Sequence, residues 1–448
     1  MTNLEPAFDW IDDNEENMLE FLDDYIQYRS TPEEEAPVQR ELIKPSFDDM
    51  EWDDVSIVDV SEEGNRPNVN AHLQGSGSGR NLLFNGHSDI VDVSEQDRET
   101  LWEHDPWQLT REEDRLYGRG TTDMKGPNTA MIWAVKAIMN TDIDLRGDIL
   151  MSIVVGEEAV QQDVGTLPAT NAILSKDIEP PFCINTEPTN NQIHTKSASL
   201  LHFDITIPGK AVHASQHNLV QYPQRTGIPN GTDVGVDAIP ILREMLDKLE
   251  RLEHEWNMRY SDQIWGSGGH PIAEDMQGVG AVTIVPTLVD AGDFIASVAN
   301  SARIQGQLYI PPSVSRTELW GELESAVMSL QSDYDWLNDH PPVLEEGELI
   351  DEYRQHSYWP GFETPVENPG CQVMGNAVAA ATGEEPVYSG FKAVNDGGFI
   401  QSTFGLDTIS FGPGDTYMGA HGADEYIPRT QLIEAAKVYA SMIVKWCS

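Results

Sequence analysis

The stretch Asp148-Ile-Leu-Met-Ser-Ile-Val-Val-Gly-Glu-Glu158 holds six apolar residues, broken only by Ser152, before its glycine and two glutamates. A short apolar run that ends in glycine predicts a strand buried on both faces. Asn81-Leu-Leu-Phe-Asn-Gly86 and Phe182-Cys-Ile-Asn185 have the same character. Residues 125–140 have the length and composition of a helix, so strand and helix alternate as in a doubly wound α/β sheet. Active groups of such sheets gather at the carboxyl ends of the strands.

The sequence pattern changes near Ser197. From there the predicted order is strand, helix, strand, strand, helix and a final short strand, which is typical of a split βαβ, or ferredoxin-like, sandwich. These elements are expected at residues 200–207, 236–254, 280–285, 303–310, 316–330 and 341–344. We therefore predict a larger α/β domain, residues 1–197 and 351–448, interrupted by an inserted α+β domain at residues 198–350.

The composition excludes several classes of protein. The 448 residues include 75 acidic and 27 basic side chains, a net charge of −48, so nucleic acid and anionic membranes are poor partners. A hydrophobic fraction of 39% argues against disorder. Such an acid-rich surface resembles those of cytoplasmic proteins from salt-loving microbes, where high ionic strength screens self-repulsion.

The cysteine usage and the apolar runs predict a cytoplasmic location. The three cysteines are far apart, at 183, 371 and 447, which argues against a disulfide framework and fits a reducing compartment. The N-terminal residues have neither the basic region nor the apolar run of a secretion signal. We find no run near the roughly 20 apolar residues that a membrane span needs. We therefore expect a soluble protein.

Histidines and carboxylates follow several of the predicted strands. Glu157 and Glu158 come after the strand quoted first, whereas other Glu-Glu pairs, such as Glu15-Glu16, are expected on the solvated surface. The remaining candidates are His87 and Asp89 after residues 81–86, Glu187 after residues 182–185, Asp123 in Tyr117-Gly-Arg-Gly-Thr-Thr-Asp-Met-Lys-Gly126, and His421 in Gly412-Pro-Gly-Asp-Thr-Tyr-Met-Gly-Ala-His-Gly422. Imidazole and carboxylate groups at one sheet edge are the ligands of a zinc, cobalt or manganese site.

Three other motifs are weaker. Gly75-Ser-Gly-Ser-Gly79 precedes a strand, so it predicts a flexible turn instead of a dinucleotide loop. Gly118-Arg-Gly120 lacks the Lys-Ser/Thr ending of a phosphate-binding loop. The sequence has no Gly-x-Ser-x-Gly elbow, which leaves a serine hydrolase without a nucleophile.

The order of the motifs resembles that of a family of co-catalytic zinc amidohydrolases, which includes acetylornithine deacetylase, succinyl-diaminopimelate desuccinylase, aminoacylase and glutamate carboxypeptidases. The matching motifs are His-x-Asp at 87–89, Gly-Arg-Gly-x-x-Asp-Met-Lys-Gly at 118–126, Gly-Glu-Glu at 156–158, Glu-Pro-Thr at 187–189 and Ala-His at 420–421. The resemblance implies that residues 1–197 and 351–448 form a mixed-sheet, metal-binding catalytic domain of the zinc-exopeptidase type. It also implies that residues 198–350 form a dimerisation or lid domain.

The resemblance also implies two divalent metal ions, zinc or else cobalt or manganese. Asp123 would bridge both ions, His87 and Glu187 would complete one set of ligands, and Glu158 and His421 would complete the other. Glu157 would be the general base that takes a proton from water and gives it to the leaving amine. Asp89, two residues past His87, is expected to hydrogen-bond the second nitrogen of that imidazole and fix its tautomer.

The family places a histidine of its smaller domain near the active site of the partner subunit, where it stabilises the oxyanion. Pro208-Gly-Lys-Ala-Val-His-Ala-Ser215 is similar to that segment, which nominates His213 and implies an obligate homodimer through the inserted domain. A cis peptide is implied between Asp123 and Met124.

Two features of the sequence bear on the substrate. Glu187, in place of the aspartate of aminopeptidase-like members, favours deacylases and carboxypeptidases. The family's Asn-x-Val-Pro and Asp-x-Arg segments, which hold a substrate carboxylate, are replaced by Ala296-Ser-Val-Ala299 and Gln307-Leu-Tyr309. Substitutes for that clamp would be Asn300, Arg303 or His270.

We predict an amidohydrolase that removes the acyl group from an N-acyl amino acid or a related N-acylated amine. A dipeptidase or carboxypeptidase with the same metals is the alternative within enzymes. A catalytically silent metal-binding scaffold is the alternative from another class, although such a protein should have lost Glu157 or a ligand.

Overall fold

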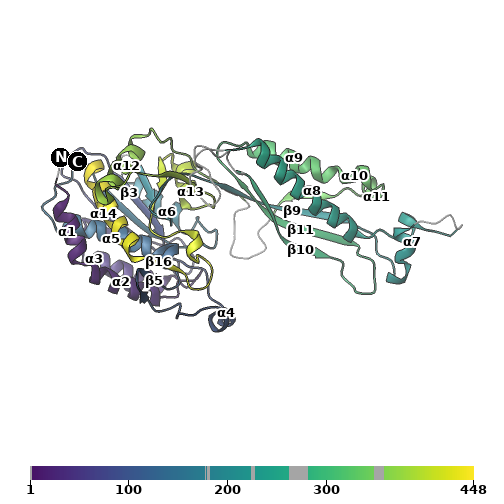
Figure 1. The fold of residues 1–448 in the computed structure, drawn as a ribbon, viewed down its shortest axis with the longest axis horizontal. Helices are drawn as coiled ribbons and strands as arrows, with labels where there is room; N and C mark the ends of the chain where they lie inside the picture. Colours follow the sequence, from purple (N-terminus) through teal and green to yellow (C-terminus); the bar gives the residue numbers. More distant parts are fainter. Residues whose placement is uncertain (1–2, 177, 179–181, 223–227, 262–280, 348–357) are drawn as a thin grey trace. The chain divides into compact units, whose positions relative to one another are not determined.

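The computed structural model describes residues 3–176, 178, 182–222, 228–261, 281–347 and 358–448, which form two compact units (Figure 1). The first unit contains the described residues up to 197 and those from 360 to 448. The described residues from 198 to 359 form the second unit, which is therefore inserted in the sequence of the first. The predicted boundary after residue 350 falls outside the described residues.

The first unit contains an eight-stranded mixed sheet. Its strands, in spatial order, are β1 (Asp54–Val58), β2 (Asn68–Leu73), β6 (Ile149–Val154), β3 (Leu82–His87), β7 (Phe182–Asn185), β15 (Thr408–Ser410), β8 (Ile193–Ser197) and β14 (Tyr388–Phe391). The four strands β6, β3, β7 and β15 are parallel, whereas β1, β2 and β6 pair in an antiparallel manner. The carboxyl ends of four neighbouring strands therefore lie at one edge of the sheet.

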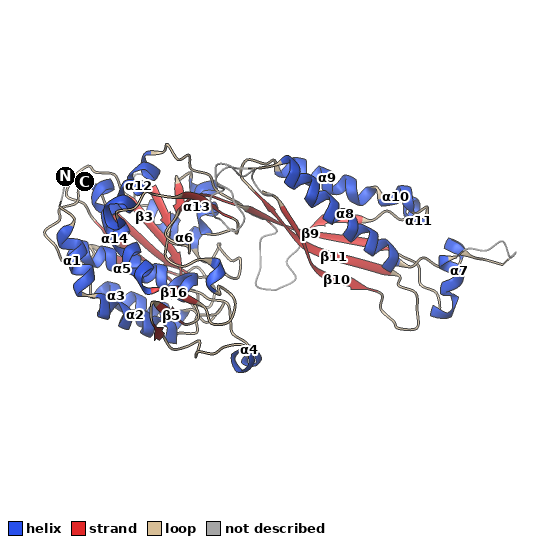
Figure 2. Ribbon diagram, in the orientation of Figure 1, coloured by secondary structure: helices blue, strands red, loops and turns tan. Residues whose placement is uncertain are grey.

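Helices cover both faces of this sheet (Figure 2). Because side chains alternate along a strand, Leu82 and Phe84 pack into the core under one helical layer, whereas Leu83 packs against the other layer. The first layer contains α1 (Glu5–Asp13), α2 (Glu15–Gln27), α5 (Gly126–Met139), α12 (Pro369–Thr382) and α14 (Arg429–Cys447), and the second contains α6 (Thr166–Leu174) and α13 (Asp396–Phe404). Strands buried on both faces explain the continuous apolar runs of the sequence.

Shorter elements complete the first unit. They are η1 (Val38–Ile43), α3 (Lys44–Asp48), α4 (Glu95–Thr100), η2 (Thr121–Lys125), η6 (Thr416–Met418) and a three-stranded sheet of β16 (Tyr426–Pro428), β5 (Arg115–Tyr117) and β4 (Thr110–Glu112). The pairing of β16 with β5 joins two segments that are far apart in the sequence.

The second unit is an antiparallel sheet with two helices. The sheet order is β10 (Thr283–Ala291), β11 (Ser301–Ile310), β9 (Ser199–Pro208) and β12 (Val343–Glu346), and β13 (Tyr358–Trp359) also pairs with β9. Alternate residues of β9, including Phe203 and Ile205, pack with α8 (Ala238–Arg259) and α9 (Arg316–Met328). Short helices occur at η3 (Ala214–Gln216), α7 (His217–Gln221), η4 (Gly231–Asp233), α10 (Leu330–Asp333) and α11 (Trp336–Asp339).

These two units confirm the predicted fold class. The second unit has the βαββαβ order of a ferredoxin-like sandwich, and the first has the mixed α/β sheet. The described helices include none with both the length and the apolar character that crossing a membrane requires.

Candidate active site

Five of the predicted site residues lie at one edge of the large sheet, where β3, β6 and β7 end and α5 begins. His87 is the last residue of β3, Glu157 and Glu158 follow β6, and Glu187 follows β7. Asp123 belongs to η2, the segment that leads into α5. Because β6, β3 and β7 are parallel neighbours, these side chains converge.

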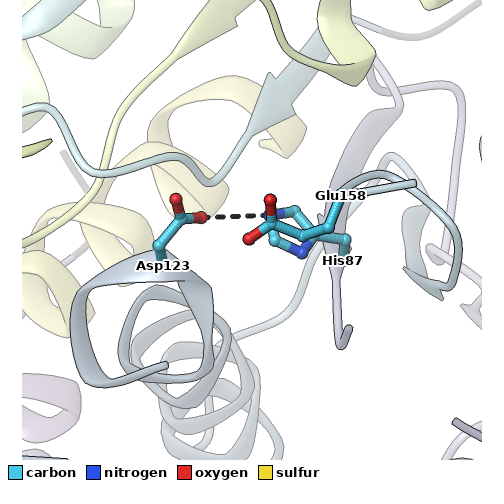
Figure 3. A group of neighbouring side chains, drawn as sticks. All are labelled: His87, Asp123 and Glu158. Carbon is cyan, nitrogen blue, oxygen red and sulfur yellow. Dashed lines mark hydrogen bonds and ion pairs between the residues drawn. The ribbon is translucent and has the colours of Figure 1, made fainter. Parts of the chain in front are cut away.

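Asp123 lies between two histidines. Its Oδ1 is 3.2 Å from His87 Nε2, and its Oδ2 is 3.3 Å from His421 Nε2. His421, from the loop between β15 and β16, is also 3.1 Å from the carboxylate of Glu158. Figure 3 shows Asp123 approaching from the segment above α5 and facing His87 and Glu158. Each oxygen of this one carboxylate thus faces a different imidazole.

Two overlapping groups of side chains have the spacing of metal ligands. One donor atom from each of His87, Asp123 and Glu158 lies within 4.8 Å of the others. His87, Glu157 and Glu187 form a second such group. Glu187 is therefore within ligand distance of His87, with which it was predicted to share a metal ion. It is within the same distance of Glu157, which was predicted to be the general base.

The loop after β6 is folded tightly around Gly156, where φ is +82°. A Cβ atom at this position would lie 3.0 Å from Nη2 of Arg66, so the conformation and the space both favour glycine. Arg66 is buried, pairs with Glu35 at 2.8 Å and donates to Gln161 Oε1 at 2.5 Å. This turn sets the direction in which Glu157 and Glu158 leave the strand.

Asp89 contacts the site differently from the predicted way. The ring Nδ1 of His87 is 3.0 Å from the main-chain oxygen of Asp89, whereas the nearest carboxylate oxygen is 3.7 Å away. The carboxylate instead accepts the main-chain N–H of Glu158 at 2.9 Å. The predicted side-chain hydrogen bond is therefore corrected: β3 ends at His87, so strand alternation no longer places Asp89 beside it.

The segment that carries Asp123 is anchored by a residue to which the sequence analysis gave no role. Lys125 is fully buried and donates to the main-chain oxygens of Tyr25 at 3.1 Å and Tyr28 at 2.6 Å. Burial lowers the pKa of Lys125 to about 7. The peptide bond between Asp123 and Met124 is cis.

A second residue without a predicted role is Asp396, at the start of α13. It is 1% exposed and lies near the side chains of Gln162 and Thr166. Burial raises its pKa to about 7. In a chain with 75 acidic residues, the sequence offers no signal that separates this aspartate from a surface one.

The electrostatics of the site favour a cation. Burial raises the pKa values of Glu157 and Glu187 well above their ordinary range, and the neighbouring carboxylates act in the same direction. Burial opposes the ionisation of Asp123, but hydrogen bonds from His421 and His87 outweigh it and hold the pKa of Asp123 far below its usual range. So many acidic groups in one buried place are costly without positive charge.

The donor set fits divalent metal ions. Ligands of one tetrahedral zinc ion, bound at about 2.0–2.1 Å, are about 3.3 Å apart. The three contacts of Asp123 and Glu158 with the histidines, at 3.2, 3.3 and 3.1 Å, match that separation. The Oε1 atom of Glu187 is buried and has no hydrogen-bond partner among the described residues, as a ligand atom would. Imidazole and carboxylate are the ligands that zinc, cobalt and manganese accept.

Three of the remaining predicted residues, His213, Asn300 and Arg303, belong to the second unit. His213 is exposed, and its Nδ1 accepts the main-chain N–H of Ser215 at 3.2 Å. Asn300 donates to Asp293 at 3.2 Å, and Arg303 makes a two-pronged ion pair with Asp204 across β11 and β9. His270 lies outside the described residues.

The mixed α/β sheet and the clustered imidazole and carboxylate groups indicate a metal-dependent hydrolase. Residues 83–445 match the protein family described as peptidase family M20/M25/M40. The chain belongs to this family, which confirms the predicted resemblance and makes the protein a hydrolase that acts on amide bonds.

Two relatives of known name align over most of the chain. The N-formyl-4-amino-5-aminomethyl-2-methylpyrimidine deformylase of Bacillus subtilis is 26% identical over 387 residues, which cover 85% of this chain and 83% of the relative. The probable succinyl-diaminopimelate desuccinylase of Staphylococcus aureus is 25% identical over 439 residues, which cover 97% of this chain and 98% of the relative.

Two solved structures share the fold over nearly their whole length. A tripeptidase from Staphylococcus aureus has a TM-score of 0.68 at 16% identity, with 97% of this chain and 99% of that chain covered. A dinuclear metal-binding peptidase of the M20 family from Bacillus subtilis has a TM-score of 0.61 at 13% identity, with 96% and 97% covered. At this level of identity the likeness supports the architecture.

Proposed function

We propose that this protein deacylates an N-acylated amine with the help of two divalent metal ions. One observation carries the proposal: the two oxygens of Asp123 face two different histidines, at 3.2 and 3.3 Å. A carboxylate with this arrangement is suited to bridging a pair of ions, each completed by one imidazole.

The proposed ligand sets are those that the family resemblance implies, and the contacts of His421 with Asp123 and Glu158 support one of them. His87 and Glu187 would join Asp123 at one ion, and Glu158 and His421 would join it at the other. Bound divalent ions, zinc or else cobalt or manganese, polarise the amide carbonyl and lower the pKa of water. The main-chain oxygen of Asp89 orients the ring of His87, and its carboxylate holds the N–H of Glu158, so Asp89 supports one ligand of each ion.

Glu157 is left for proton transfer. Its Oε2 is 3.9 Å from Nε2 of His87, so its carboxylate lies beside the ligands and can receive a proton from water. The same oxygen can then deliver that proton to the nitrogen of the leaving amine. The neighbouring Glu158 contacts His421 and is assigned to the metal.

The substrate is proposed to be an acylated amine, with an N-acyl amino acid as one member of the class. The two named relatives are a deformylase and a probable desuccinylase, which both remove an acyl group. The one arginine proposed for binding a substrate carboxylate, Arg303, is already paired with Asp204. Binding by Arg303 and Asn300 thus stays a prediction, and substrates without a carboxylate belong in the test.

The decisive experiment is a panel of N-formyl, N-acetyl and N-succinyl amines, with and without a carboxylate, assayed for released amine. Dipeptides and longer peptides with a free C-terminal carboxylate serve as the comparison set, and each assay is run in low and in molar salt. Hydrolysis of the acyl amines, lost on metal removal and restored by metal, supports the proposal. Faster hydrolysis of dipeptides favours the dipeptidase alternative, and no turnover on either set contradicts both.

We also propose a homodimer formed through the second unit. The strand β10 is at the edge of its sheet among the described residues, and Leu288 and Val289 on it are 55% and 51% exposed. Pro286 lacks an N–H, so pairing with a second copy is expected beyond it, at residues 288–291. In the exposed segment before α7, His213 would then act as an oxyanion donor for the partner. Its Nδ1 accepts an N–H, so the neutral ring carries its proton on Nε2.

The Leu288→Glu variant is expected to be monomeric. Charge placed on two symmetry-related edges repels, and the apolar contact is lost. Light scattering coupled to size-exclusion chromatography measures the mass.

A Met258→Lys variant is the matched control, because Met258 is an exposed apolar residue of the same unit, on α8. A wild-type protein that is already monomeric at working concentration contradicts the proposed dimer. A dimer that persists in the Leu288→Glu variant would show that the interface lies on another surface and not at β10.

We propose a cytoplasmic location and adaptation to high salt as well. Cys183, Cys371 and Cys447 are buried free thiols, which suits a reducing compartment. The net charge of −48 favours a fold that gains stability as salt screens its self-repulsion.

A further inference from the structure

The carboxylate of Glu425 accepts four hydrogen bonds in the interior of the first unit. Glu425 is fully buried. Its Oε2 accepts from Nη1 of Arg119 at 2.6 Å and from the N–H of Gly120 at 3.0 Å. Its Oε1 accepts from the N–H of Thr122 at 2.8 Å and from the N–H of Asp123 at 3.0 Å.

Three of these four donors are main-chain groups of one short segment. A buried ion pair with Arg119 would need none of them. Convergent main-chain N–H groups form a concave anion site, and hydrogen bonds to an ionised carboxylate are stronger than neutral ones. Gly120, with φ at +83°, lets the chain bend so that its N–H joins those of Thr122 and Asp123. Glu425 thus holds the main chain that carries Asp123.

The same residue belongs to the segment that carries the other partner of Asp123. His421 precedes Glu425 by one short loop. Residues 422–426, which include part of this loop and the start of β16, accept three further hydrogen bonds from residues 118–122. The N–H of Gly118 donates to the main-chain oxygen of Glu425 at 2.9 Å. Nη2 of Arg119 donates to the oxygen of Gly422 at 2.9 Å, and Oγ1 of Thr122 donates to the oxygen of Tyr426 at 2.6 Å.

His421 itself lies on the exposed side of this loop. His421 is exposed and has φ at +60°, a left-handed conformation that few residues other than glycine adopt readily. The imidazole reaches Asp123 and Glu158 from the solvent side of the site. Its position therefore depends on how firmly the following residues are held.

We propose that Glu425 is a positioning residue for the metal centre. By binding the N–H of Asp123 while sharing a loop with His421, it fixes the separation between these two ligands. The inference rests on the proposed function, since it assigns Asp123 and His421 to the metal ions. Glu425 itself touches neither substrate nor ion and acts through the main chain of Asp123.

The test is metal binding by a Glu425→Gln variant. Glutamine keeps the volume but replaces one acceptor oxygen with a donor, so it cannot accept on both sides. Titration of the metal-free protein with Zn²⁺ in the presence of a competing chelator gives stoichiometry and affinity. We expect a loss of about 10- to 100-fold in affinity for at least one ion, the range typical of residues that orient metal ligands.

The control is an Asp424→Asn variant. Asp424 precedes Glu425, and its carboxylate accepts the N–H groups of Glu103 and His104 at 3.0 Å, away from the Asp123 segment. We expect this variant to bind Zn²⁺ as the wild type does. Equal losses in both variants would assign the effect to general loosening of residues 421–426 and overturn the inference.

A Glu425→Asp variant covers the case in which Glu425→Gln does not fold. Aspartate keeps the charge for Arg119 but withdraws the oxygens by one methylene, so metal affinity should still fall. Wild-type affinity for both ions in a folded Glu425→Asp or Glu425→Gln protein overturns the inference. A wild-type protein that binds no Zn²⁺ instead contradicts the proposed function, so the two failures are distinguishable.

Discussion

The Asp123→Asn variant is expected to lose at least about 10³-fold in kcat/KM and to bind at most one divalent ion per chain. The carboxylate of Asp123 faces His87 and His421 at 3.2 and 3.3 Å, so each of its oxygens is placed for one ion. The amide nitrogen of asparagine cannot bind metal, so the variant keeps an oxygen for only one of the two ions. Bound ions contribute several kcal/mol to charge stabilisation, and each 1.4 kcal/mol is about a factor of ten in rate. Elemental analysis and steady-state kinetics measure the two quantities.

The control for this experiment is the Asp148→Asn variant. Asp148 also places a carboxylate oxygen 2.9 Å from a histidine nitrogen, that of His72, but it lies just before β6, at the opposite end of the strand from Glu157. Its metal content and turnover should match the wild type. Two tightly bound ions in the Asp123→Asn protein would rule out the bridging role.

The Glu157→Gln variant is expected to keep both metal ions and to lose about 10²- to 10⁴-fold in kcat, the usual contribution of a general acid–base group. Glutamine preserves the shape of the side chain but cannot accept a proton from water. Because Glu157 groups with His87 and Glu187, metal analysis is needed beside the kinetics.

The adjacent Glu158→Gln variant is expected to differ from Glu157→Gln in its metal content. The carboxylate of Glu158 is 3.1 Å from His421, so its loss should lower metal content as well as turnover. Loss of metal from the Glu157→Gln protein, together with full metal content in the Glu158→Gln protein, would show that Glu157 is the ligand and Glu158 the general base. Wild-type turnover in Glu157→Gln would end the general-base assignment.

The strands that carry the site could be predicted because they are buried on both faces. Continuous apolar runs at residues 81–86, 148–156 and 182–185 correspond closely to β3, β6 and β7. Their parallel order explains why His87, Glu158 and Glu187 could be expected at one edge before their positions were known.

Strands with buried polar residues were not predictable from apolar periodicity. Asn68 and Asn70 of β2 are both buried, since their side chains donate to the main-chain oxygens of Val58, Val164 and Ala169. A sequence pattern reports polarity but not such hydrogen bonds, so no strand was predicted at residues 68–73.

The supporting residues of the site were hidden for a related reason. Glu425 is one of 75 acidic residues, and its partners at residues 119–123 are far away in the sequence. The contact of Asp89 with Glu158 depends on where β3 ends, which periodicity locates only approximately. Ligand types could be predicted from the sequence, whereas the groups that orient them required the three-dimensional arrangement.

The position of β15 in the large sheet has a consequence for biosynthesis. This strand lies between β7 and β8, yet it is encoded after the whole second unit, and His421 comes later still. A nascent polypeptide therefore leaves the ribosome with a gap in its largest sheet until the whole second unit and β15 have been translated. Prematurely terminated products should be unable to hydrolyse anything, and the late-arriving strand should be the step at which chaperones or proteases intervene.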